Sequence, residues 1–138
     1  LYSRHELGDA FVREDFLDSY FDADNIASID MAYVDTMEKA ILAHEAELIS
    51  IVQTLAPKFE LSTIPVMHIM IIMIALTEML YASSADTPEA VSVNEAIELA
   101  KRFSDDQGRM FINGALSTFL KKRETVMLSK KETEFRIF

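Results

Sequence analysis

Residues 93–114 read Val-Asn-Glu-Ala-Ile-Glu-Leu-Ala-Lys-Arg-Phe-Ser-Asp-Asp-Gln-Gly-Arg-Met-Phe-Ile-Asn-Gly. This stretch predicts the end of one helix, a short acidic break at 104–108 and the start of a second helix. The first helix buries an apolar side made of Val93, Ala96, Ile97, Ala100 and Phe103. The second should run from about Gln107 to Lys122 and bury Phe111, Ala115, Leu116 and Phe119. Two consecutive helices are therefore the starting point for the fold.

The composition favours helices along the whole chain. The 138 residues include only 3 Gly and 3 Pro, too few for a turn-rich β fold, while the helix formers Met, Leu, Ala and Glu are abundant. A chain of this length suits one domain and buries about two-thirds of its unfolded surface. The absence of Cys excludes disulfides and thiolate metal sites and fits a reducing cytoplasm. We predict an all-α protein.

The segments before the opening stretch also have helical patterns. Residues 1–21 should form one or two short helices broken near Gly8, with a buried side made of Phe11, Phe16, Leu17, Tyr20 and Phe21. A long helix should begin at Ser28 or Asp30, either of which can cap it, and end at Ala56 before Pro57.

Two further helix starts combine a capping hydroxyl with a proline. Thr63 and Pro65 predict a helix from 64 to about 81, and Thr87 with Pro88 predict the next one after a loop at 83–86. Residues 124–138 are polar and mixed in charge, and we expect a mobile tail there.

The helix predicted at 64–81 is apolar on nearly all sides. Crossing a membrane takes about 20 uninterrupted apolar residues, so a buried central helix is the better interpretation. Met67, Met70 and Met73 form a stripe that indicates core packing or, because Met adapts its shape, an interface. His68 is expected to be a hydrogen-bonded core histidine.

The net charge of −10 argues against strong long-range attraction to nucleic acid. Residues 1–30 carry eight acids against two arginines, whereas residues 121–138 carry six basic residues against three acids. Any RNA binding would have to come from a local basic patch and would be weak and salt-sensitive.

The sequence contains no arrangement that indicates catalysis or a cofactor. His44-Glu45-Ala46-Glu47 lacks the second His four residues on that a zinc protease helix needs, because position 48 is Leu. No Gly-rich loop could hold phosphates, and no Ser has an evident His and acid to activate it. We predict a non-enzymatic protein with no metal and no cofactor.

Residues 93–114 resemble the C-terminal motif of the NusB family of bacterial transcription antitermination factors. Residues 74–80, Ile-Ala-Leu-Thr-Glu-Met-Leu, are similar to the family's central helix, Pro88 stands where the family has a proline, and Leu1-Tyr2-Ser3 resembles the end of its first helix. The resemblance implies a compact bundle of about six to seven helices in two packed subdomains, here residues 1–123 followed by a tail at 124–138. It also implies a cytoplasmic protein that binds boxA-type single-stranded RNA together with the ribosomal protein NusE.

By the same resemblance, the RNA-binding residues would be Tyr2, Arg4, Lys101, Arg102, Arg109 and Phe111. The aromatic side chains could stack on unpaired bases and the cations could contact phosphates, although Phe111 could equally be a core residue. The partner surface would include Glu78, Glu89, Glu95, Asp105 and Asp106, unless these carboxylates are simply solvated.

The chain departs from the family pattern at several positions. The family's Arg-rich N-terminal helix has no counterpart in the printed residues, a usual basic residue is Met110, and a usual Tyr is Thr77. Charged positions of the central helix are Ile69 and Met73 here. We therefore expect a further burial partner for that helix, either a second copy in a homodimer through 64–81 or a domain upstream of Leu1.

Two other functions remain open at this point. NusB-like domains also precede the catalytic domain of an rRNA cytosine methyltransferase, where they help to position RNA, although residues 130–135 look more like a chain end than a linker. A protein-only scaffold that has lost RNA binding is the other alternative.

Overall fold

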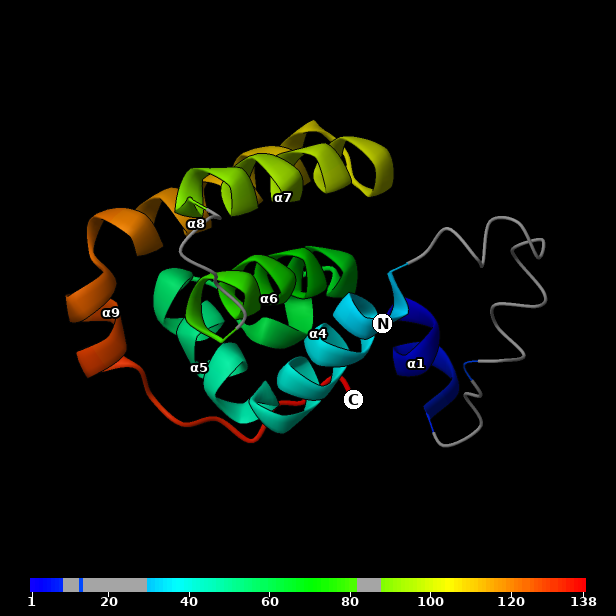
Figure 1. The fold of residues 1–138 in the computed structure, drawn as a ribbon. Helices are drawn as coiled ribbons and strands as arrows, with labels where there is room; N and C mark the ends of the chain where they lie inside the picture. The colour runs from blue at the N-terminus through cyan, green and yellow to red at the C-terminus, as the bar shows by residue number, and fades with distance from the viewer. Residues whose placement is uncertain (9–12, 14–29, 82–87) are drawn as a thin grey trace.

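The computed structural model describes residues 1–8, 13, 30–81 and 88–138, and these form helices and connecting segments without any strand. Labelled as in Figure 1, they are α1 (Tyr2–Leu7), α4 (Met31–Ala43), α5 (Glu45–Leu55), the 3-10 helix η2 (Leu61–Thr63), α6 (Val66–Leu80), α7 (Glu89–Phe103), α8 (Asp106–Lys121) and α9 (Arg123–Ser129). The all-α prediction is confirmed. The predictions for Ser28, Thr87, the aromatic residues at 11–21 and the loop at 83–86 lie outside the described residues.

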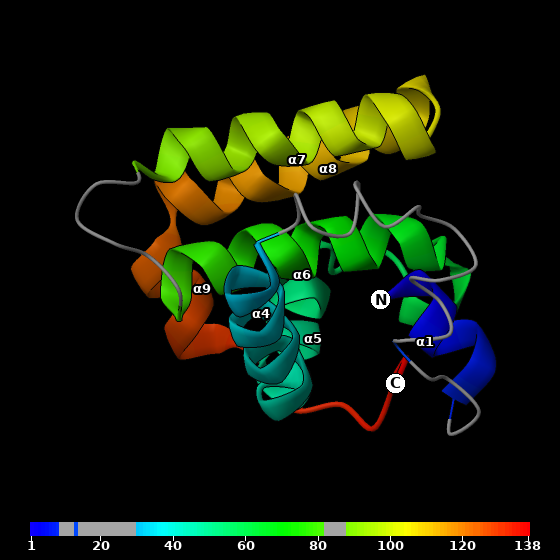
Figure 2. The same cartoon turned by 45° about the vertical axis from the view of Figure 1, so that its right-hand side comes forward.

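Helix α6 is the centre of the fold. It contacts α1, α4, α5, α7 and α8, and Figures 1 and 2 show it between the α7–α8 pair and the α4–α5 pair. Its buried residues are Ile69, Met70, Ile71, Ile72, Met73, Ala75, Leu76, Thr77 and Met79. The one buried hydroxyl among them, that of Thr77, donates to the Met73 carbonyl at 2.7 Å, so it is satisfied within the helix. The buried central helix is confirmed, and none of the described helices has the length and apolarity to cross a membrane.

This packing removes the reason for expecting a homodimer through residues 64–81. Ile69 and Met73, the apolar replacements that suggested a missing partner, are both 0% exposed within the single chain. Met70 is also buried, so most of the methionine stripe is core. The neighbouring helices of the same chain supply the burial that we had assigned to a second copy.

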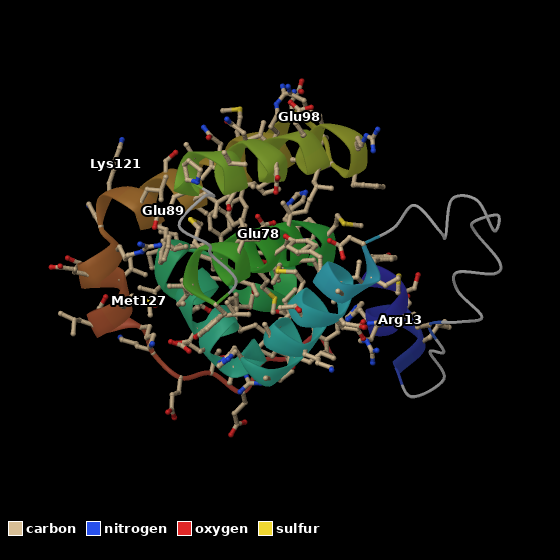
Figure 3. The ribbon with its side chains drawn as sticks, viewed as in Figure 1. Arg13, Glu78, Glu89, Glu98, Lys121 and Met127 are labelled. Carbon is tan, nitrogen blue, oxygen red and sulfur yellow. The ribbon has the colours of Figure 1, made fainter. Side chains whose placement is uncertain are left out.

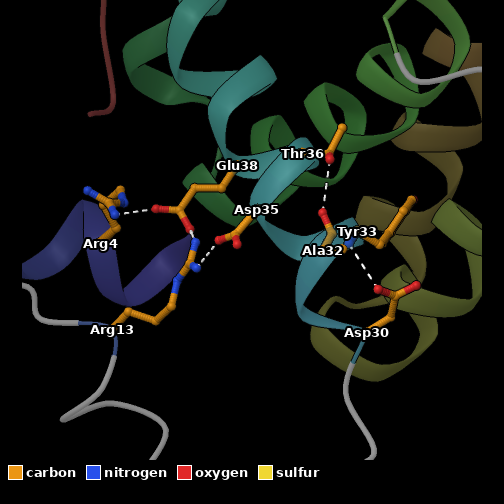
Figure 4. Close-up of polar contacts among 8 residues, drawn as sticks. All are labelled: Arg4, Arg13, Asp30, Ala32, Tyr33, Asp35, Thr36 and Glu38. Carbon is orange, nitrogen blue, oxygen red and sulfur yellow. Dashed lines mark hydrogen bonds and ion pairs between the residues drawn. The ribbon is translucent and has the colours of Figure 1, made fainter.

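The structure has two helices, α4 and α5, where the sequence predicted a single helix from Asp30 to Ala56. The start is as expected, because Asp30 Oδ1 accepts the Tyr33 backbone N–H at 3.1 Å (Figure 4). The helix is interrupted at His44, whose φ of −111° and ψ of 17° are not helical. The His44 ring stacks on Tyr81, with ring centroids 3.8 Å apart, so the break coincides with a contact to the end of α6.

Two local predictions on other helices are wrong. The Thr63 hydroxyl does not cap α6 but donates to the Glu60 carbonyl at 2.6 Å inside the preceding turn, and Pro65 takes the N-cap position. Phe103 is 58% exposed instead of buried, because it is the last residue of α7 and borders an open pocket beside the turn to α8. The predicted ends of α7 and α8 agree with the structure to within one residue.

The expected mobile tail is instead part of the packed structure. Residues 123–129 form α9, and the segment that follows runs back along α5 towards α1 (Figure 1). Ile137 is only 5% exposed, and the Ile137 and Phe138 backbone N–H groups donate to Glu45 Oε2 at 2.8 and 3.0 Å. The apolar residues of this segment pack against the core, and Lys130 forms an ion pair with Glu47 of α5.

Candidate nucleic-acid interface

The turn between α7 and α8 brings several of the predicted RNA-binding residues together. We define the α7–α8 turn surface as Lys101, Arg102, Phe103, Ser104, Asp105, Asp106 and Arg109. The turn is fixed by Asp105, whose Oδ1 accepts the Gly108 backbone N–H at 2.7 Å and caps α8. Beside it lies an open pocket of about 490 Å³ lined by Pro65, His68, Arg102, Phe103, Ser104 and Asp105.

The cations of this surface differ in their partners. Lys101 Nζ lies 2.9 Å from Glu98 Oε1, and Arg109 Nη2 lies 2.7 Å from Asp106 Oδ1, both exposed pairs one helical turn apart. Within the described part of the chain no ion pair involves Arg102, which is exposed and lines the pocket. Exposed pairs of this kind contribute little to stability, so a phosphate could compete for Lys101 and Arg109 but would meet Arg102 directly.

Phe111 lies behind the turn surface and is half-buried rather than fully in the core. Its ring makes an edge-to-face contact with Phe59, with centroids 5.6 Å apart at 83°, and lies 6.3 Å from the His68 ring. Both interpretations of Phe111, stacking and packing, thus keep a structural basis. Phe59, which is 52% exposed, was missed in the sequence because it lies in a loop outside any periodic segment.

His68 of α6 contacts the α7–α8 turn through Ser104. Its Nε2 and the Ser104 Oγ are 2.5 Å apart, which agrees with the expectation of a hydrogen-bonded histidine, although the ring is only partly buried. Burial lowers the pKa of His68, and the nearby Asp105 acts in the opposite direction. The hydrogen bond ties the N-terminal turn of α6 to the α7–α8 connection.

Gly108 and Gly114 of α8 offer a matched pair of substitutions. A Cβ on Gly108 would overlap Ser104 Oγ and His68 Nε2 and lie 2.6 Å from His68 Cε1, whereas a Cβ on Gly114 would meet nothing within 4 Å. We expect Gly108→Ala to destabilise the fold by about 1–3 kcal/mol through overpacking. Gly114→Ala should stabilise it by about 0.5–1 kcal/mol, because alanine is the better helix former. Urea unfolding of both variants measures the difference, and equal stabilisation would mean that the His68–Ser104 packing is not tight.

Tyr2 and Arg4 lie on α1, far in sequence from the residues of the turn surface. Figures 1 and 2 place α1 towards the same end of the molecule as the α7–α8 turn. Tyr2 is 46% exposed and accessible. The Arg4 guanidinium forms an ion pair with Glu38 of α4, and Arg13 pairs with Glu38 and Asp35 (Figure 4). Arg4 therefore anchors α1 on α4, a structural role that the sequence did not indicate.

The predicted partner residues Glu78 and Glu95 share a groove of about 340 Å³, which we call the α4–α7 groove. It lies between α4, α6 and α7, and its lining is mostly apolar: Leu1, Tyr33, Val34, Met37, Glu38, Ile41, Ile74, Glu78, Glu95 and Leu99. Burial, followed by the charge of Glu95, raises the pKa of Glu78, while the Ser92 hydroxyl donates to its Oε2 at 3.1 Å. Burial and the charge of Glu78 raise the pKa of Tyr33 to about 12. The groove thus contains two carboxyl groups, those of Glu78 and Glu95, in surroundings that disfavour the charged form of Glu78.

This electrostatic arrangement predicts a stabilising substitution. An acid whose folded pKa is raised above its unfolded value, near 4.5 for Glu78, binds more protons when folded, so its contribution to stability falls as the pH rises above that value. Glu95→Gln removes the second charge and should raise the melting temperature at pH 7 by about 1–3 °C. Differential scanning calorimetry should show that the gain shrinks as the pH falls and Glu78 takes up a proton, because a neutral Glu78 is no longer repelled by the charge at position 95. Glu98→Gln, on the same helix, is the control and should give no gain; a gain as large as that of Glu95→Gln would contradict the prediction.

The other predicted partner acids do not lie in this groove. Figure 3 shows Glu78 beneath α7, Glu98 on the outer side of α7 and Glu89 at the far end of α7, near α9. Glu89 forms an ion pair with Arg123. Asp105 and Asp106 belong to the turn surface, where the first caps α8 and the second pairs with Arg109. The five acids therefore occupy three separate places on the molecule.

Comparison with known proteins assigns the family. The model of the NusB family matches residues 2–121, which include every residue discussed in the turn surface and the α4–α7 groove except Leu1. The chain belongs to the NusB family. It is 31% identical over 104 residues to the transcription antitermination protein NusB of Finegoldia magna, covering 75% of this chain and 74% of the relative. The NusB protein of Latilactobacillus sakei is 34% identical over 117 residues, with coverage of 83% and 80%.

A third NusB relative, from Enterococcus faecalis, is 36% identical over 91 residues, which are 65% of this chain and 58% of the relative. The chain thus spans between about half and four-fifths of the length of these relatives. None of the solved structures matches it. These relatives are named as transcription antitermination proteins and not as enzymes, and the prediction of a non-enzymatic protein agrees with those names.

Proposed function

We propose that this protein is a transcription antitermination factor that binds boxA-type RNA together with a small ribosomal protein, as the resemblance to NusB implied. The observation that carries the proposal is the family match over residues 2–121, supported by relatives that are themselves named transcription antitermination proteins. Such a role in transcription would be carried out in the cytoplasm. A homodimer through α6 is not part of the proposal, because that helix is already buried.

The RNA would bind at the α7–α8 turn surface. Arg102 is an exposed cation beside a pocket, and Phe103 next to it presents a ring that is 58% exposed. Exposed aromatic rings next to cations suit single-stranded RNA, since bases stack on the rings while phosphates contact the cations. Lys101 and Arg109 add two further cations to this surface, and Phe111 extends it. Helix α1, which carries Tyr2, lies towards the same end of the molecule.

The protein partner would bind at the α4–α7 groove. Glu78 and Glu95 lie together in a mostly apolar lining, where burial and mutual repulsion make the charged state of Glu78 unfavourable. A Lys or Arg side chain from a partner would relieve this repulsion, and apolar side chains beside it would fill the groove. Glu89, Asp105 and Asp106 are left out of this surface because they lie elsewhere.

Binding to RNA measured with and without the partner tests the proposed function. Titration of a fluorescein-labelled boxA RNA, followed by anisotropy, should give weak binding by the protein alone and tighter binding when the ribosomal protein is added. Between about 50 and 200 mM salt the affinity should fall steeply, since phosphate contacts release counterions. Tight binding that does not depend on salt, or no binding even with the partner present, would contradict the proposal.

A protein-only scaffold is the second candidate, favoured by two observations. The net charge is −10, and two of the cations on the turn surface are already paired with neighbouring acids. A scaffold would form a complex with the ribosomal protein, which size-exclusion chromatography would detect. In the anisotropy titration it would add nothing to the affinity of the ribosomal protein for RNA.

A further inference from the structure

A second apolar groove lies next to the turn surface, between the segment that follows α5 and the middle of α8. We call it the Phe59 groove; its volume is about 350 Å³, within the range of about 300–1,000 Å³ found for ligand sites. The lining residues are Leu55, Ala56, Pro57, Lys58, Phe59, Met110, Phe111, Gly114, Ala115 and Thr118. Phe59 is 52% exposed and Met110 is 73% exposed, so the groove presents apolar side chains that the fold leaves uncovered.

The charge of this groove is positive. Among the described residues that line it, Lys58 alone is charged, and its side chain is exposed. Glu60 follows Phe59 in the chain but does not line the groove. At Gly114 the absence of a side chain leaves open space above the helix, since nothing lies within 4 Å of the position of a Cβ. A flat ring can therefore approach the backbone of α8 at this point.

The Phe59 groove is continuous with the turn surface through Phe111. The Phe111 ring contacts Phe59 on one side, at 5.6 Å between centroids, and faces His68 on the other, at 6.3 Å. His68 lines the pocket that also contains Arg102 and Phe103. A row of rings thus runs from this pocket across Phe111 to Phe59, with Arg102 at one end and Lys58 at the other. Exposed rings with a cation at each end fit a single strand of RNA better than a partner helix, which would need a longer apolar face.

We infer that the Phe59 groove holds an unpaired nucleobase of the bound RNA. The base stacks on the exposed part of the Phe59 ring, Met110 covers its edge, and Lys58 contacts the adjoining phosphate. The inference rests on the proposed function, because it extends the RNA path from the turn surface by one further binding position. It assigns a role to Phe59 and Lys58, for which the family resemblance offered none.

The absence of tryptophan from the sequence provides a direct test. In the whole chain, Phe59→Trp creates a single-tryptophan protein whose fluorescence should be quenched when boxA RNA is added, because a stacked base quenches an indole. Leu128→Trp is the control, since Leu128 is 88% exposed on α9, and its fluorescence should not change.

Affinity measurements complete the test. Phe59→Ala should weaken RNA binding at least about fivefold without changing the salt dependence, because the lost stacking is uncharged. Lys58→Ala should instead lower the slope of log affinity against log salt by about 0.7. Circular dichroism should show that both variants keep the helical fold.

The outcomes separate this inference from the proposed function. If the unsubstituted protein binds RNA while Phe59→Ala binds equally well and the fluorescence of the Phe59→Trp variant is unchanged, the base position is wrong and the proposed function stands. If Phe59→Ala loses the ribosomal protein but not RNA, the groove is a protein interface and the inference is overturned. If the unsubstituted protein binds no RNA with the partner present, both are overturned.

Discussion

Phe119→Ala should destabilise the protein by about 3–5 kcal/mol, which is a large fraction of the stability of a domain of this size. Phe119 is 0% exposed and is among the largest fully buried side chains. It comes from the C-terminal half of α8, and the Arg123 guanidinium at the start of α9 lies over its ring, 4.9 Å from the centroid. Its removal would therefore leave a cavity in the core and remove a contact between α8 and α9.

The neighbouring residue provides the control for this prediction. Leu120 follows Phe119 on α8 but is 37% exposed, so Leu120→Ala should cost much less. Urea unfolding followed by circular dichroism gives both values, with the same m-value expected for each variant. Similar costs for the two substitutions would mean that α8 does not pack with Phe119 inwards.

Ile137→Ala is expected to have the second largest effect, a loss of about 2–4 kcal/mol. Ile137 is 5% exposed, its backbone N–H donates to Glu45 Oε2 at 2.8 Å, and its carbonyl accepts a hydrogen bond from His5 Nδ1 on α1. Residues near a chain end rarely contribute this much unless they are packed. The prediction therefore tests whether the C-terminal segment holds α1 and α5 together.

Leu128→Ala is the matched control, because Leu128 is 88% exposed in the same C-terminal region and should be nearly neutral. Hydrogen exchange adds a local measurement: Ile137→Ala should speed exchange in residues 2–7 of α1 as well as in 130–138. If Ile137→Ala is as neutral as Leu128→Ala and exchange in α1 is unchanged, the C-terminal segment does not pack as described.

Much of the fold follows from local patterns. The apolar period of residues 93–119 predicts α7 and α8, and the continuous apolar run at 64–81 predicts a buried α6, because these signals depend on neighbours a few residues away. The break at His44 could not be predicted in this way, since it coincides with a stacking contact to Tyr81 far along the chain. The packing of the C-terminal segment could not be predicted for a similar reason. Its apolar residues Phe135, Ile137 and Phe138 stand among charged ones, and the backbone of Ile137 is hydrogen-bonded to His5 of α1 and Glu45 of α5.

For the candidate site, the sequence indicates which residues to consider but not which contacts they make. The family motif names Arg102 and Phe111 together because they are close in sequence, and both lie near His68 in the structure. It does not indicate that Arg4 pairs with Glu38 or that Glu89 pairs with Arg123, since both contacts join distant helices. Phe59 was overlooked because a single aromatic residue in a loop has no period to mark it.

The central claim is that RNA binds at the α7–α8 turn surface, and a comparison of two variants that each lose one positive charge tests it most directly. Arg102→Ala removes an exposed cation of that surface for which the described residues provide no ion pair. Lys121→Ala removes an equal charge at the other end of α8, on the order of 20 Å away at about 1.5 Å per residue. Anisotropy with boxA RNA and the ribosomal protein should show that Arg102→Ala weakens binding severalfold and lowers the salt slope by about 0.7, while Lys121→Ala leaves both nearly unchanged. Equal losses from the two variants, or a larger loss from Lys121→Ala, would contradict the claim.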